Sequence, residues 1–148
     1  MRRVVITGIG VVSPLGSGLQ HNWQAIKNGK SGIGQISHFD TSELPVKIAG
    51  MVPTGTGENE FDMDGFMSPK EQRKVSNFII YALKAAEEAI EDANWKPEKE
   101  HDLIRTGVIV GSGIGGLREI ENSAINMHEK GARRISPFFI PSSLINLA

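Results

Sequence analysis

Three glycines in the last third of the chain have the spacing of a nucleotide-binding turn. Gly111, Gly113 and Gly116 match G-x-G-x-x-G, a pattern that lets the backbone approach a pyrophosphate at a helix N-terminus. Such a turn follows the first strand of its fold, with an acidic residue about 20 positions later. Here about a hundred residues precede the turn, and Ser136 and Pro137 occupy the later position. The motif alone is weak support for a nucleotide-dependent oxidoreductase.

Other residue types narrow the chemistry further. The 148 residues contain no cysteine, which excludes a disulfide framework, a cysteine-based zinc site and a cysteine nucleophile within this chain. The four histidines lack ligand spacing such as H-x-x-x-H, and we expect no metal site from them; they are His21, His38, His101 and His128.

A cluster of cations could bind an anionic partner. Lys70, Arg73 and Lys74 stand at i, i+3 and i+4, which places them on one face of a helix. Cations in the first turns of a helix oppose its dipole, so their presence hints at an external anion. Arg133 and Arg134 add two more charges. From the residues alone, a solvated charged face remains the alternative.

The elements that must position these residues follow from hydrophobic periodicity. Apolar runs at 4–6 and 108–110 predict strands buried in a parallel sheet. A weaker strand is expected at 46–49. Between the first strand and Gly29, the spacing of apolar residues predicts a helix that Ser17 could cap.

The middle of the chain has a clear helix start. Ser68, Pro69 and Glu71 form a capping box with proline in the first turn. A helical period then continues to Asn94, with a possible break between a short and a longer helix. We expect a helical insertion at about 66–95.

The glycine cluster is expected to be a strand-to-helix turn. Apolar residues at helical spacing follow it and end at Gly131. The missing side chains of the cluster would admit another backbone or a ligand; its members are Gly111, Gly113, Gly115 and Gly116. Ser142 is a candidate cap for one more helix.

The overall composition describes a soluble globular protein of one domain. Hydrophobic residues make up 39%, charged residues 22%, and the net charge is −1. This balance argues against a general nucleic-acid binder. No apolar run reaches the roughly 18 residues of a membrane span. Thr7, Gly8 and Gly10 interrupt the apolar N-terminus, which disfavours a signal peptide and makes the cytoplasm the default compartment.

Several stretches together resemble one family. They are RRVVITGIGVVSPLG from Arg2 to Gly16, KEQRK from Lys70 to Lys74, VGSGIGGL from Val110 to Leu117, and RRISPFFIPS from Arg133 to Ser142. The chain is similar over its whole length to the N-terminal part of the 3-oxoacyl-[acyl-carrier-protein] synthase II family, the condensing enzymes of bacterial fatty-acid elongation.

The resemblance implies an α/β, thiolase-like fold, with α-β-α-β-α layers in the complete enzyme, a homodimer, and only an incomplete first half in this chain. It implies that residues 1–148 are a beta-ketoacyl synthase domain truncated before its nucleophile. The implied reaction is decarboxylative condensation of an acyl thioester with malonyl-acyl carrier protein, giving 3-oxoacyl-acyl carrier protein. No metal, nucleotide or other cofactor is implied.

The family's roles carry over to particular positions. Ile114 matches a residue that lines the acyl pocket near the subunit interface, and Phe139 matches one that reaches toward the pocket of the partner subunit. The cations match the patch that docks the acidic acyl carrier protein; they are Lys70, Arg73, Lys74, Arg133 and Arg134. No residue of this chain matches the catalytic cysteine, histidines or lysine.

The departure from the family pattern predicts that this chain alone is inactive. It also leaves a second hypothesis, a non-catalytic remnant or carrier-protein-binding module. Because the sheet would be incomplete, we expect the runs at 4–6 and 108–110 to lack neighbours and to favour aggregation over a stable monomer.

Overall fold

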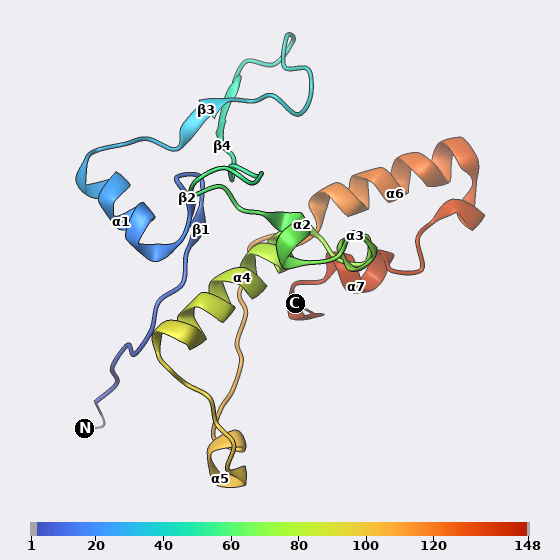
Figure 1. Cartoon of the computed structure of the whole chain (residues 1–148). Helices are drawn as coiled ribbons and strands as arrows, with labels where there is room; N and C mark the ends of the chain where they lie inside the picture. Colours follow the sequence, from blue (N-terminus) through green and yellow to red (C-terminus); the bar gives the residue numbers. More distant parts are fainter. Residues whose placement is uncertain (1–2, 148) are drawn as a thin grey trace. The chain divides into compact units, whose positions relative to one another are not determined.

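The chain is organised in two units, and each unit draws on separate stretches of sequence. The computed structural model describes residues 3–147. Unit 1 consists of Met1–Met63 with Lys84–Asn94, and unit 2 of Asp64–Leu83 with Trp95–Ala148. Figure 1 labels the elements of both units.

Unit 1 contains short antiparallel strands and one full helix. Strand β1 (Val12–Ser13) pairs with β2 (Gly16–Ser17), and β3 (Ile33–Gln35) pairs with β4 (Ile48–Gly50). Helix α1 (Leu19–Lys27) follows β2, and residues 84–92 of α4 (Asn77–Asp92) complete the unit. Ala25 and Phe61 are its buried apolar residues among those described. The strand expected at 46–49 is thus present, shifted toward Gly50.

The start of α1 differs from the prediction. Gly18, not Ser17, occupies the N-cap position, and it offers no side chain to the first turn. The Glu88 carboxylate caps the first turn instead. Its Oε1 accepts a hydrogen bond from the Leu19 N–H at 2.7 Å. A carboxylate is favoured at this end of the helix dipole. At the other end, Asn28 is the C-cap and Gly29 has a φ of +64°, as the sequence predicted.

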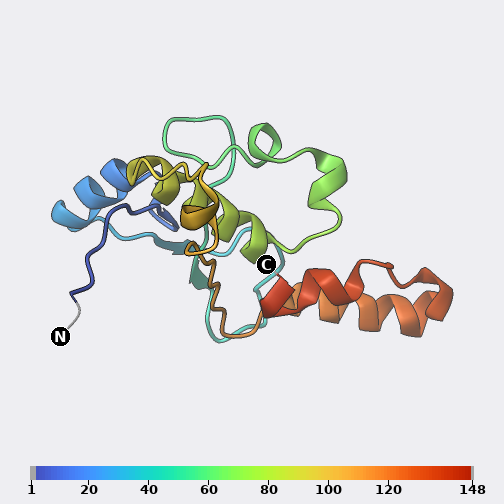
Figure 2. The ribbon, with the colours of Figure 1, turned by 90° about the horizontal axis from the view of Figure 1, so that it is seen from below.

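Unit 2 is helical. Its elements are the greater part of α2 (Met63–Phe66), α3 (Pro69–Gln72), the first half of α4, α5 (Glu100–Leu103), α6 (Leu117–Lys130), η1 (Ala132–Arg134), α7 (Phe139–Ser143) and η2 (Ile145–Leu147). Figures 1 and 2 show that the chain turns after α6, so that η1 and α7 lie alongside it. Ile79 and Ile80 of α4 are the buried apolar side chains of the described part of this unit.

The predicted helix start at Ser68 is confirmed, but only half of the capping box is formed among the described residues, because the Glu71 carboxylate is bonded to Lys74. The Ser68 hydroxyl accepts a hydrogen bond from the Glu71 N–H at 3.3 Å, and Pro69 begins α3. The break before the longer helix is also confirmed, because α3 ends at Gln72 and α4 begins at Asn77. The helix predicted after the glycine cluster is α6, and it ends at Gly131.

Two predicted strands are not formed. Residues 4–6 and 108–110 belong to no strand, and Figure 1 draws both without arrows. The prediction that they are buried was wrong: Val4 is 94% exposed and Ile109 is 98% exposed. A strand needs a neighbour to pair its backbone groups, and no described residue provides one here. The expectation that these runs would lack sheet neighbours is confirmed.

The predicted cap at Ser142 was wrong as well. Ser142 lies inside α7, which begins at Phe139, and its hydroxyl donates back to the Phe139 carbonyl at 3.1 Å. Among the residues that the structure describes, no helix is long and apolar enough to cross a membrane.

Candidate functional site

A groove in unit 2 brings together residues from five helical elements and the turn after η1. Its volume is about 290 Å³. Arg73 comes from the end of α3, Asn77 from α4, Arg134 from η1 and Phe139 from α7. The polar face of α6 supplies the remaining wall, with Glu119, Asn122, Ser123 and Asn126.

The charged groups of the groove are two guanidinium groups and the Glu119 carboxylate. Arg73 and Arg134 line the groove, and neither forms a salt bridge with any residue in the described range 3–147. A guanidinium presents several N–H donors in a planar fork, which suits carboxylates and phosphates. The neighbouring amides can add donors. This arrangement can hold an anionic group.

Lys74 is already engaged within the chain. Its Nζ donates to Glu71 Oε1 at 2.7 Å and Oε2 at 2.9 Å, and it lies 5.9 Å from the centre of the Phe138 ring. The hydrogen bond from Lys74 holds the pKa of the Glu71 carboxyl below its ordinary value. Lys70 and Arg133 are exposed and do not line the groove.

The two residues assigned to an acyl pocket are not brought together. Phe139 is partly buried and forms part of the groove. Ile114 is 68% exposed and is not part of the groove wall. The groove therefore contains Phe139 and two of the five predicted docking cations, Arg73 and Arg134.

The glycine cluster has one crowded end and one open end. Gly115 has a φ of +81°, and its position leaves no room for a side chain beside the Ser143 carbonyl. A Cβ on Gly116 would lie 2.5 Å from the Ser76 hydroxyl and 2.7 Å from the Ser142 carbonyl oxygen. Gly111 and Gly113 have no neighbour within 4 Å of such an atom. The close approach is thus between the turn and α7.

The sequence prediction missed the polar residues of the groove and the buried Ser76, which is bonded to the groove residue Glu119. Ser76 is 3% exposed, and its hydroxyl lies 2.6 Å from Glu119 Oε2. Asn122 and Asn126 stand at i and i+4 on α6. That spacing was visible in the sequence, but polar residues on one face of a helix are also typical of a solvated surface.

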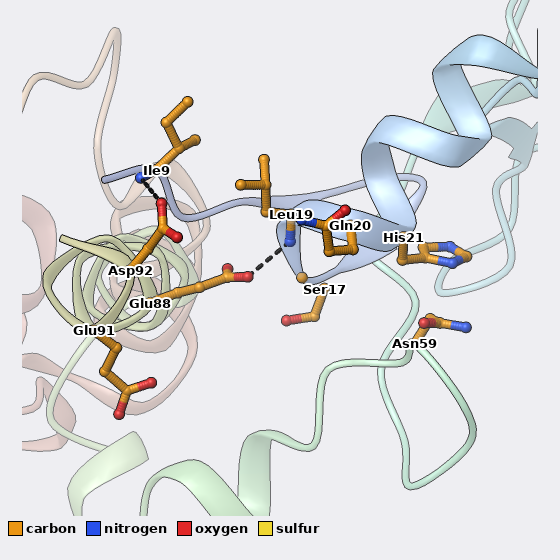
Figure 3. A pocket seen from close by; sticks show the side chains of 10 residues that line it. Ile9, Ser17, Leu19, Gln20, His21, Asn59, Glu88, Glu91 and Asp92 are labelled. Atoms are coloured by element: carbon orange, nitrogen blue, oxygen red, sulfur yellow. Dashed lines mark hydrogen bonds between the residues drawn. The ribbon is translucent and has the colours of Figure 1, made fainter. Parts of the chain in front are cut away.

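A second cavity, in unit 1, is larger, but two of its carboxylates already accept hydrogen bonds from the backbone. It measures about 410 Å³ and includes Glu88, Glu91 and Asp92 of α4. Figure 3 shows Glu88 and Asp92 reaching the backbone of Leu19 and Ile9. Two of the three carboxylates therefore hold the N-terminal segment in place. Within residues 3–147, no group of three or more ligand side chains could hold a metal ion.

Comparison with known proteins matches this chain to a single family over its full length. The family model described as "Beta-ketoacyl synthase, N-terminal domain" matches residues 1–148. The 3-oxoacyl-[acyl-carrier-protein] synthase 2 of Rhizobium meliloti (strain 1021) is 52% identical over 149 residues, which cover 100% of this chain and 35% of the relative. The chain spans about a third of the length of the curated relatives it matches.

Solved structures agree on the fold. A beta-ketoacyl synthase from Burkholderia phymatum STM815 superposes with a TM-score of 0.71 at 27% identity, covering 99% of this chain and 35% of that one. The ishigamide ketosynthase/chain length factor gives a TM-score of 0.71 at 26% identity, covering 94% and 33%. The predicted thiolase-like α/β fold class is confirmed. The chain belongs to the beta-ketoacyl synthase family, whose N-terminal domain model it matches from end to end.

Proposed function

We propose that this domain serves a 3-oxoacyl-[acyl-carrier-protein] synthase of fatty-acid biosynthesis. The reaction joins an acyl thioester to malonyl-acyl carrier protein, releases carbon dioxide and gives 3-oxoacyl-acyl carrier protein. The names and identities of the full-length relatives support this assignment. The observation that carries it is the groove of unit 2, where Arg73, Arg134 and Phe139 come together.

The residues of this chain would bind substrates and would not perform the bond-making step. Arg73 and Arg134 would accept acidic groups of the carrier protein, with Lys70, Lys74 and Arg133 around them. Phe139 and Ile114 would offer apolar surface to the acyl chain, because each buried methylene contributes about 0.8 kcal/mol. The proposal includes a homodimer in the cytoplasm, without metal or nucleotide.

Charge reversal at the groove tests carrier binding. We expect R73E and R134E each to weaken binding of the R. meliloti acyl carrier protein by about 1 kcal/mol, roughly fivefold in Kd, since exposed charge pairs have energies of this size. The affinity of the unchanged chain should fall as salt rises, because ions screen exposed charges. Fluorescence anisotropy of a labelled carrier protein would measure both effects.

Arg105 provides the matched control, because it is an exposed arginine of unit 2 outside the groove. R105E changes the net charge of the chain by the same amount and should leave Kd within about twofold. Equal losses for R105E and R73E would mean that only net charge matters and would refute the assigned groove.

The second candidate function is a carrier-binding module without chemistry. It assigns carrier binding to the cations of the groove and no reaction step to the 148 residues, which contain no cysteine to serve as the thiolate nucleophile. We expect no 3-oxoacyl product when this chain alone is given acyl- and malonyl-carrier protein. A chimera in which this chain replaces the matching third of the R. meliloti enzyme separates the two: condensation supports the synthase, and carrier binding without condensation supports the module.

A further inference from the structure

A buried hydroxyl connects three elements of unit 2. Ser76, Ser142 and Ser143 are 3%, 6% and 7% exposed. A buried polar group is costly unless it is hydrogen-bonded. Ser76 stands just before α4, and its carbonyl accepts the Ile79 N–H at 3.0 Å, which begins that helix. The Ser76 carbonyl thus belongs to the start of α4, whereas its hydroxyl bonds to two other helices.

The Ser76 hydroxyl lies between α6 and α7. It is 2.6 Å from Glu119 Oε2 in the first turn of α6 and 2.5 Å from the Ser142 carbonyl oxygen in α7. A serine hydroxyl has one proton to donate, so the two acceptors share it. This shared bond fixes the distance between the start of α6 and the end of α7.

The glycine turn also contacts α7 close to Ser76. The Gly116 N–H donates to the Ser143 carbonyl at 3.1 Å, and Gly116 has no space for a side chain beside Ser76 and Ser142. Within α7, the Ser142 and Ser143 hydroxyls both donate to the Phe139 carbonyl, at 3.1 Å and 2.6 Å. Hydrogen bonds therefore run from Ser76 through α7 to the backbone of Phe139.

We propose that Ser76 is a positioning residue for the acyl chain: its hydroxyl holds α7, and with it Phe139, at a fixed distance from the glycine turn. The inference rests on the proposed function, in which Phe139 contacts the acyl chain. Ser76 itself lies under α7 and touches no substrate. Loss of its hydroxyl should loosen α7 and alter the selection among acyl lengths, while leaving carrier docking by Arg73 and Arg134 in place.

The first experiment measures amide hydrogen exchange in the 148-residue chain. In S76A, we expect the Gly116 amide to exchange about tenfold faster, which corresponds to about 1.4 kcal/mol. S143A is the control, because Ser143 is also buried but its hydroxyl bonds only within α7. Its effect on the exchange rate of the Gly116 amide should stay below about twofold.

The second experiment uses the R. meliloti chimera with the same substitutions. We expect S76A to change the ratio of kcat/KM between long and short acyl substrates at least about threefold, with KM for malonyl-carrier protein within about twofold. Unchanged Gly116 exchange, or faster exchange with an unchanged ratio, would overturn the positioning role. An inactive unsubstituted chimera would instead count against the proposed function, and the exchange result would still decide whether Ser76 holds α7.

Discussion

At the scale of single residues, two carboxylates of α4 bind the backbone of the N-terminal segment in unit 1. Glu88 accepts two backbone hydrogen bonds, from Val11 at 2.9 Å and from Leu19 at 2.7 Å. Asp92 accepts a third, from Ile9 at 3.0 Å. These backbone groups would otherwise need water or another acceptor. Glu88 is therefore the main polar contact between α4 and the N-terminal segment.

Removing the Glu88 carboxylate should destabilise unit 1. We expect E88A to cost about 1–3 kcal/mol in the free energy of unfolding, because it leaves two N–H groups without their acceptor. The Glu91 carboxylate faces the same cavity and forms no hydrogen bond with the residues that the structure describes, so E91A should stay within about 0.5 kcal/mol. Urea unfolding of both variants in a W95F background, where Trp23 is the remaining fluorophore, would compare their losses of stability. Equal losses would contradict this role for Glu88.

Adding one methyl group should distinguish the two ends of the glycine cluster. G116A would place a Cβ 2.5 Å from the Ser76 hydroxyl and 2.7 Å from the Ser142 carbonyl oxygen. Overpacking of this kind costs about 1–3 kcal/mol. G111A meets no atom within 4 Å and should be close to neutral. Thermal unfolding of the two variants measures the difference, and a neutral G116A would show that the junction yields easily.

At the scale of elements, α3 is a short helix that depends on its own polar groups. Ser68 accepts the Glu71 N–H, and Glu71 in turn holds Lys74 one turn later. Negative charge in the first turn is favoured by the helix dipole. The hydrogen bond from Lys74 is the main reason why the pKa of Glu71 lies below 4.5.

The lowered pKa predicts how α3 responds to acid. A carboxyl with a lowered folded pKa contributes stability above its ordinary pKa of 4.5, and that stability is lost as pH falls through the folded value. We expect an NMR titration of Glu71 to give a midpoint below 4.5, and K74Q to move it upward. K84Q breaks a similar pair with Glu87 and should leave the Glu71 midpoint unchanged; a shift with K84Q would point to net charge instead.

Elements whose signals are local could be predicted, and those that depend on distant residues could not. The α3 cap lies within four consecutive residues, so the sequence shows it directly. The first turn of α1 is satisfied by Glu88, 69 positions away, which no local pattern reveals. The runs at 4–6 and 108–110 have the composition of buried strands, but pairing depends on neighbours that composition does not specify. The prediction that Lys70, Arg73 and Lys74 share one helix face was wrong, because α3 ends at Gln72 and only Arg73 of the three lines the groove. The buried Ser76 was not predicted.

At the scale of the whole molecule, much apolar surface remains uncovered. Val4 and Ile6 are 94% and 81% exposed, and Val108 and Ile109 are 81% and 98% exposed. Unpaired runs of β-branched residues can add to another chain through their free backbone groups. Unpaired backbone groups and β-branched side chains would suit these runs to a sheet, and they also make this chain prone to self-association.

Sedimentation should detect that association and its dependence on the exposed runs. We expect I109K to weaken self-association at least about tenfold, because burying a side chain of this size contributes about 1.5–3 kcal/mol. S37K adds the same charge at another exposed position and should have a much smaller effect. A chain that stays monomeric at high concentration would rule out this source of association.

The interleaving of the two units has a consequence for biosynthesis. Unit 1 is interrupted after Met63 and resumes at Lys84, and the Ile9 N–H finds its acceptor 83 positions later, at Asp92. On the ribosome, the first strands therefore emerge long before the carboxylates that hold them. The Ser76 hydroxyl likewise binds the carbonyl of Ser142, which is translated 66 positions later. Nascent chains must stay open until late in translation, a period in which chaperones can bind them.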